Sequence, residues 1–251
     1  MSNLSFARRD GIAVVTLARP PMNTMDATLL EELAALFERL AAEEAVRAAV
    51  IAAEGRAYSA GLDLKSVPDL DKPGQRRLIR ALNDGFGSLY AWPKPLVAAV
   101  NGHAIAGGLI LALCADWRVV ADVPLQASLA EVRVGVTYPV AALDVARSEL
   151  APSAARRLVL LGESLDARQA MSLGVFDECV PVGELAGRAL AAARRHAELP
   201  PQAFATIKSE LRSAALTRIA AARLGSGEPR FAAWLGEEMR HAAAAALRGA
   251  A

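Results

Sequence analysis

Cysteine is scarce in this chain of 251 residues, which contains only Cys114 and Cys179. Two cysteines are too few for the disulfide framework that holds small secreted domains together. Cys114 lies in an apolar run typical of a helix, so we interpret both as reduced structural thiols. The N-terminal sequence also lacks the apolar core of a signal peptide, and we therefore expect a cytoplasmic protein.

An excess of charge of one sign is also absent. The chain has 28 basic and 27 acidic side chains, which gives a formal net charge of +1. Its arginine pairs are scattered among acidic residues and form no basic stripe, an arrangement typical of solvated helix and strand faces. We therefore expect no nucleic-acid partner.

A continuous apolar segment of membrane length is missing as well. The one uncharged stretch of that length, residues 96–115, is interrupted by Asn101, Gly102 and His103 and then by two further glycines. These residues divide the stretch into a strand, a turn and a helix, which excludes a transmembrane span. We expect no membrane partner.

The residues that are present favour one globular α/β protein with a sizeable core, since 54% are hydrophobic and 22% charged. Two segments, residues 4–9 and 12–19, flank Asp10-Gly11, a dipeptide typical of a type I′ hairpin. Asp26 can cap a helix over residues 27–44. A strand-strand-helix order then recurs without close sequence similarity and predicts a spiral of β-β-α units.

Helical patterns dominate the chain beyond Pro139. The predicted elements there are a capped helix within residues 164–174, a last strand over 175–180, and helices over 182–198, 201–216 and 228–247.

Two glycine-bearing turns are the most informative segments: GRAYSAGLDL at residues 55–64 and NGHAIAGGLI at residues 101–110. Each follows a strand-like run and leads into a helical pattern, so each can present unpaired backbone N–H groups at a helix start. Two such groups, converging from separate loops, would form an oxyanion hole for an enolate. The alternative for Gly107-Gly108 is ordinary close packing of a helix start against a strand.

The same two segments resemble the enoyl-CoA hydratase/isomerase (crotonase) superfamily, whose pattern is S-A-G-x-D-L followed by N-G-x-x-x-x-G-G. The likeness continues at residues 92–95, 115–116 and 173–177. The resemblance implies a crotonase-like (ClpP/crotonase) α/β fold with a C-terminal helical trimerisation region.

The resemblance also implies a division of the chain and an assembly. Residues 1–195 would form the spiral core with the acyl-CoA site, and residues 196–251 the helical oligomerisation region. The protein would be a homotrimer or a dimer of trimers.

Matching motif to motif assigns the two oxyanion-hole donors to the N–H groups of Leu62 and Gly107. The family holds the adenine of coenzyme A against alternating backbone groups of the first loop, which correspond to Ala60, Leu62 and Leu64. Lys65 is a candidate phosphate contact, or equally a solvated lysine. Coenzyme A would arrive as part of the thioester substrate, so no separate cofactor and no metal ligands are expected.

Hydratases of this family carry two glutamates, and this chain matches only the second, Glu131. The first position is Ile110, which can neither orient nor deprotonate a water molecule. A single glutamate is enough to move one proton, and the segment around Glu131 resembles the isomerase branch, which converts 3-enoyl-CoA to 2-enoyl-CoA. In an apolar pocket its pKa would rise toward the working pH.

Three other interpretations remain at this point. Glu131 alternates with valines and could be a solvent-exposed residue of a polar strand. The reaction could be decarboxylation or hydrolysis of another acyl-CoA, which also passes through an oxyanion. The protein could also bind acyl-CoA or RNA without catalysis, although its balanced charge disfavours RNA.

Overall fold

The computed structural model describes residues 3–63, 66–224 and 228–231, and its elements follow a repeated strand-strand-helix order. The strands are β1 (Leu4–Arg9), β2 (Ile12–Leu17), β3 (Ala48–Ala53), β4 (Ala57–Ser59), β5 (Leu96–Val100), β6 (His103–Ile105), β7 (Trp117–Ala121), β8 (Ala127–Ser128), β9 (Ser164–Leu165) and β10 (Glu178–Val180). The α-helices are α1 (Ala27–Ala42), α2 (Lys72–Tyr90), α3 (Gly107–Leu113), α4 (Val140–Glu149), α5 (Pro152–Ala155), α6 (Ala167–Ser172), α7 (Leu185–Ala197), α8 (Pro201–Leu211) and α9 (Ser213–Arg223).

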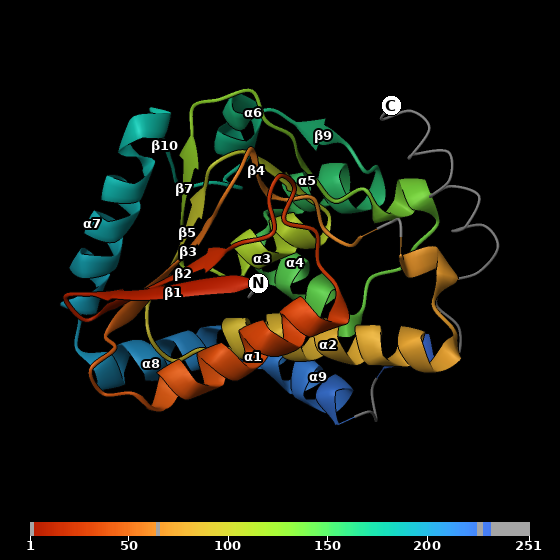
Figure 1. Ribbon diagram of the computed structural model, residues 1–251, viewed down its shortest axis with the longest axis horizontal. Coiled ribbons are helices and arrows are strands. Elements are labelled where there is room, and N and C mark those ends of the chain that lie inside the picture. The colour runs from red at the N-terminus through yellow and green to blue at the C-terminus, as the bar shows by residue number, and fades with distance from the viewer. Residues whose placement is uncertain (1–2, 64–65, 225–227, 232–251) are drawn as a thin grey trace.

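A six-stranded sheet of order β1-β2-β3-β5-β7-β10 forms the middle layer of the molecule. All its pairs are parallel except the β1–β2 hairpin. Helix α7 covers one face, and α1 to α4 lie on the other (Figure 1). Because both faces are covered, β3, β5 and β7 are almost continuously apolar, as buried parallel strands are.

The first predicted elements are confirmed. Asp10 and Gly11 both have positive φ, 49° and 77°, as a type I′ turn requires. The Asp26 side chain accepts a hydrogen bond from the Leu29 N–H at 2.9 Å and caps α1. The predicted β-β-α repeat is present as β1-β2-α1, β3-β4-α2, β5-β6-α3 and β7-β8-α4.

A second sheet of order β4-β6-β8-β9 stands beside the first. The sequence predicted the β-β-α order but not that these short strands form a sheet of their own. Each time the chain leaves β3, β5 or β7 of the large sheet, it adds a strand of two or three residues to this small sheet. The pairs β4–β6 and β6–β8 are parallel, and β9 closes the edge in the antiparallel direction. The turns that follow β3, β5 and β7 therefore all leave the large sheet at the carboxyl ends of these neighbouring strands.

The helix predicted over residues 201–216 is wrong in its extent, because it is two helices, α8 and α9, that meet at Arg212. Arg212 is buried, and its guanidinium stacks 4.1 Å from the centre of the Tyr90 ring. The buried contact of Arg212 holds the chain at this point, so the helix ends there although helix propensity alone would continue it. Of the predicted helix over 228–247, the described residues include only 228–231, where Pro229–Phe231 forms a 3₁₀ turn.

A buried ionic cluster attaches α8 and α9 to the sheet. Asp116, at the start of β7, accepts hydrogen bonds from the Leu96 N–H at 2.8 Å and from Lys208 at 2.7 Å, and lies 3.2 Å from Arg212. Arg212 also lies 3.2 Å from Glu149. Burial lowers the pKa of Lys208 to about 8. Within the described residues, no helix has the length and apolarity that crossing a bilayer requires.

Replacing Asp116 is expected to destabilise the protein far more than breaking an exposed ion pair. Asp116→Ala would leave Lys208 without its carboxylate in a buried site, at a cost of about 3–5 kcal/mol in the free energy of unfolding. The matched control is Asp84→Ala, which breaks the more exposed pair with Arg223 (3.0 Å) and should cost about 1 kcal/mol or less. Urea denaturation of both variants measures the difference, and equal costs would contradict the role given to Asp116.

Candidate active site

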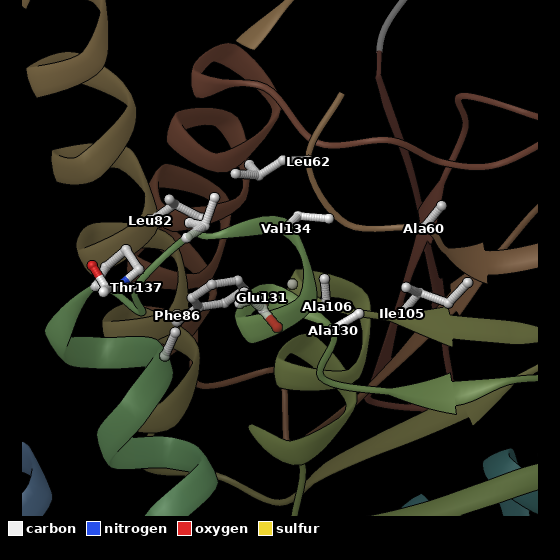
Figure 2. A pocket seen from close by; sticks show the side chains of 14 residues that line it. Ala60, Leu62, Leu82, Phe86, Ile105, Ala106, Ala130, Glu131, Val134 and Thr137 are labelled. Atoms are coloured by element: carbon white, nitrogen blue, oxygen red, sulfur yellow. The ribbon is translucent and has the colours of Figure 1, made fainter. Parts of the chain in front are cut away.

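Three turns meet at the edge where β4, β6 and β8 end. They carry residues 60–62, 106–107 and 129–131, and the pairing of the three strands places them side by side. Between them lies a pocket whose walls are mostly apolar (Figure 2). Its lining residues are Ala60, Leu62, Leu82, Phe86, Ile105, Ala106, Gly107, Ala130, Glu131, Val134, Val136, Thr137, Pro139 and Ala142.

Leu62 lines the pocket, and its N–H takes no part in the contact of this turn with Met25. Met25 and Leu62 form an isolated parallel bridge in which the Met25 N–H donates to the Gly61 carbonyl (2.7 Å) and the Asp63 N–H donates to the Met25 carbonyl (3.1 Å). In this parallel pattern Met25 bonds to the carbonyl before Leu62 and to the N–H after Leu62, so the Leu62 N–H itself points away from Met25. Among the described residues the Leu62 N–H has no acceptor.

The Gly107 N–H is the second donor at the pocket that has no acceptor in the part of the chain that the structure describes. Gly107 is the first residue of α3, and the first N–H groups of a helix have no acceptor within it. The two turns touch, because a methyl group added at Gly61 would lie 3.1 Å from the Gly107 nitrogen. Two unpaired N–H groups from separate loops at one pocket can both donate to a single carbonyl oxygen.

Ala106 holds an unfavourable backbone conformation next to this donor, with φ 52° and ψ −124°. A residue with a Cβ adopts this region at a cost of about 1–3 kcal/mol. The Ala106 N–H donates to the Ser128 carbonyl at 2.7 Å, which fixes the turn to β8. Because ψ of Ala106 sets the plane of the next peptide, this conformation determines the direction of the Gly107 N–H.

The two glycines of this turn have different surroundings. A Cβ at Gly108 would overlap the Ser59 carbonyl oxygen, so glycine there is required by close packing of α3 against β4. A Cβ at Gly107 would lie 3.5 Å from Met25 Sδ and from Phe86 Cζ, an ordinary contact distance. The packing alternative raised from the sequence therefore applies to Gly108, and the protein's own atoms leave room for a methyl group at Gly107.

Among the described residues that line the pocket, Glu131 is the one carboxylate. It begins a 3₁₀ turn, Glu131–Val134, and not the exposed strand that its alternation with valines would allow. Its Oε2 is sealed from solvent and has no partner among the described residues. Burial raises the pKa of Glu131 to about 7.

Ile110, the position where hydratases of the resembling family carry their first glutamate, is fully buried in α3. Its side chain belongs to the main hydrophobic core and is not among the lining residues of the pocket.

The predicted coenzyme A contacts divide into two pairs. Ala60 and Leu62 line the pocket, on the turn that follows β4. Leu64 and Lys65 lie outside the described residues, so their assignment remains a prediction.

A carboxylate from the C-terminal segment also supports the pocket, and the sequence patterns did not reveal it. Glu228 accepts hydrogen bonds from the Asn83 side chain at 2.8 Å and from the Val140 N–H at 3.0 Å, and so caps α4. The Asn83 side-chain oxygen, Oδ1, accepts a hydrogen bond from the Ala141 N–H at 2.9 Å. These bonds fix α2 against α4, which contribute Leu82, Phe86 and Ala142 to the apolar wall of the pocket. No local pattern could indicate contacts between residues so far apart in sequence.

Comparison with known proteins gives a consistent result. A family model described as enoyl-CoA hydratase/isomerase matches residues 7–227. The probable enoyl-CoA hydratase EchA17 of Mycobacterium tuberculosis is 33% identical over 206 residues, which cover 79% of this chain and 76% of that protein. An enoyl-CoA isomerase structure from the same organism has a TM-score of 0.79 and 34% identity, covering 89% of this chain and 97% of its own. The human mitochondrial Δ3-Δ2-enoyl-CoA isomerase has a TM-score of 0.91 and 25% identity, with 99% and 98% covered.

The different surroundings of the two glycines predict opposite effects on folding. Gly107→Ala should fold normally, because the added methyl group meets only ordinary contacts. Gly108→Ala should lose about 3 kcal/mol or more of stability or fail to fold, because the methyl group must displace the β4 backbone. Soluble yield and thermal unfolding compare the pair, and similar stability of both variants would show that the close approach of α3 and β4 is not as described.

The raised pKa of Glu131 predicts how stability depends on pH. Its carboxyl group favours the folded state below pH 4.5, its ordinary pKa, and that contribution is lost as the pH rises through about 7. Glu131→Gln removes the ionisation, so its stability relative to the wild type should be about 2 kcal/mol greater at pH 8 than at pH 5. Glu198→Gln at the exposed end of α7 serves as the control and should give no such difference. A Glu131→Gln difference that stays constant from pH 5 to pH 8 would mean that the carboxyl group titrates as in water.

Proposed function

Because this chain belongs to the enoyl-CoA hydratase/isomerase family, we propose that it is an enoyl-CoA isomerase that converts 3-enoyl-CoA to 2-enoyl-CoA with Glu131 as its single acid-base group. One observation carries the proposal. Within the described part of the chain, one carboxyl group with a pKa of about 7 shares an apolar pocket with two backbone N–H groups that have no acceptor. These are the groups that are required to transfer one proton at a carbon atom next to a carbonyl group.

In the proposed reaction the thioester oxygen accepts hydrogen bonds from the Leu62 and Gly107 N–H groups. The Glu131 carboxylate takes a proton from C2, and the electrons of that C–H bond delocalise over C1 to C4 and the oxygen as a dienolate. Glu131 then returns the proton to C4, which leaves the double bond between C2 and C3. The carboxyl group acts first as base and then as acid, and a pKa near neutrality suits both steps.

The names of the relatives support both a hydratase and an isomerase, so the choice depends on this chain's own residues. Hydration requires a water molecule held and activated between two polar groups. Ile110 is apolar and buried in the core, and Glu131 is the one carboxylate that the described residues contribute to the pocket lining. These features favour proton transfer within the substrate over addition of water.

Recognition of coenzyme A and the assembly are part of the same proposal. We assign the adenine to the backbone of Ala60, Leu62 and Leu64, with Lys65 near a phosphate, in a cytoplasmic enzyme that forms a trimer or a pair of trimers. In support, α8 exposes a pair of large apolar side chains, Ile207 at 64% and Leu211 at 83%. Such exposure is typical of a surface that another protein covers.

The decisive test is turnover of 3-hexenoyl-CoA by the wild type and by Glu131→Gln. The amide keeps the shape of the side chain but cannot accept the proton, so the rate should fall about 10⁴-fold, the upper end for loss of a general base, because one group serves both steps. Binding of coenzyme A, measured by calorimetry, should be unchanged. Glu198→Gln is again the control and should keep full activity. Isomerisation that survives in Glu131→Gln would refute this assignment.

The same preparation distinguishes the hydratase. Crotonyl-CoA hydration by the wild type should be slower than isomerisation by about 10²-fold or more. Faster hydration than isomerisation would instead support the activity named for EchA17. Binding with neither reaction would support the decarboxylase, hydrolase or non-catalytic alternatives.

A further inference from the structure

The pocket has one end formed by helices, which lies across Glu131 from the turn after β4. In Figure 2, Ala60 of that turn is on one side of Glu131, and Leu82 and Phe86 of α2 are on the other. Ala142 of α4, the helix against which α2 packs, lines the same pocket. Since the turn after β4 is the part assigned to coenzyme A, the helical end is where the acyl carbons beyond C2 would lie.

Helix α2 is packed too closely on its other sides to move away from the pocket. Two glycines, Gly85 and Gly87, flank Phe86 and let the α2 backbone approach its neighbours. A Cβ at Gly85 would lie 3.1 Å from the Leu30 side chain of α1. One at Gly87 would lie 2.8 Å from the Ile219 side chain of α9. Because such contacts leave no space for α2 to shift into, the helical end keeps its dimensions when a ligand enters.

The size of this pocket limits how much of an acyl chain it can bury. The described residues form a cavity of about 110 Å³. An engineered apolar cavity of about 150 Å³ in another protein holds one benzene molecule, which has six carbon atoms. On that scale the present cavity has room for about four carbon atoms.

Phe86 occupies much of the space that a longer chain would need. It is 1% exposed and is the largest side chain of the described pocket lining. A methyl group added at Gly107 would lie 3.5 Å from the tip of its ring, Cζ, so the ring reaches from α2 to the turn that carries the second N–H donor.

We propose that this enzyme is specific for short acyl groups, roughly four to six carbon atoms long, and that Phe86 sets the limit. The inference rests on the proposed function, because it takes an acyl-CoA thioester as the ligand. Carbon atoms up to about C6 are buried against the apolar wall and contribute to affinity. Carbon atoms beyond that limit find no further buried apolar surface among the described residues and contribute nothing.

The test is binding of saturated acyl-CoA thioesters from butanoyl-CoA to dodecanoyl-CoA, measured by calorimetry with the full chain. Affinity should rise about 15-fold from butanoyl-CoA to hexanoyl-CoA, the gain expected for burying two methylene groups. From hexanoyl-CoA to dodecanoyl-CoA it should change less than about twofold or fall. An affinity that continues to rise through dodecanoyl-CoA would overturn the proposal.

Phe86→Leu tests the residue that sets the limit. The smaller side chain enlarges the pocket, so octanoyl-CoA should bind about fivefold more tightly than hexanoyl-CoA. The matched control is Phe37→Leu, the same exchange at a fully buried phenylalanine of α1 that does not line the pocket. It should keep the wild-type dependence on chain length. The same dependence in both variants would refute the role given to Phe86.

If Phe86→Leu does not fold, Ala142→Val tests the same limit from α4, because its two added methyl groups fill part of the cavity. Hexanoyl-CoA should then lose most of its advantage over butanoyl-CoA, and an unchanged advantage would refute the proposal.

Binding of saturated thioesters requires no turnover, so this profile tests the chain-length limit even if the isomerase assignment fails. Isomerisation of 3-hexenoyl-CoA together with affinity that rises through dodecanoyl-CoA would support the proposed function and refute the limit. Absence of any acyl-CoA binding would contradict both.

Discussion

The close approach of two backbone segments, residues 55–62 and 101–108, is the constraint on which the rest of this structure depends. Three glycines permit it. A Cβ at Gly102 would overlap the Arg56 carbonyl oxygen, one at Gly108 would overlap the Ser59 carbonyl oxygen, and one at Gly61 would lie 2.9 Å from the Ala106 Cβ. Because the segments can touch, β4 and β6 pair as parallel neighbours, and their turns release two N–H groups side by side. The pocket depends on glycines at this crossing, because without their side chains the two backbone segments can come into contact.

The large sheet and the first helix could be predicted from sequence because their determinants are local. Apolar runs, the Asp10-Gly11 turn and the Asp26 cap each carry their information within a few residues. The small sheet could not be predicted, since strands of two or three residues have no periodicity to detect. The division of α8 from α9 was missed for a related reason. Arg212 is a good helix former, and only its burial against Tyr90 and Glu149 distinguishes it from a residue that continues a helix.

The candidate site shows the same division. The glycine turns and the spacing to Glu131 indicated three positions, and the structure places Leu62, Gly107 and Glu131 around one pocket. The residues that the sequence did not reveal lie outside the pocket lining and contact the elements that form it. Tyr138 follows Glu131 by only a few residues, but nothing in the local sequence indicates that its hydroxyl donates to the Leu129 carbonyl. Side chains that support a site are identified by tertiary contacts. A sequence motif can therefore identify the reacting groups but not the residues that hold them in place.

The features that would make this pocket reactive are also those that make it unfavourable to fold. Ala106 keeps a strained φ and ψ, and Glu131 keeps a carboxyl group away from water. Both costs fall on short turns, where the small sheet, α3 and the α2–α4 wall hold the backbone from several sides. A turn held so firmly cannot relax into a better hydrated or less strained conformation. The rigid surroundings thus preserve an unpaired N–H group and an ionisable carboxyl group facing one apolar space, which a more flexible loop would satisfy with water.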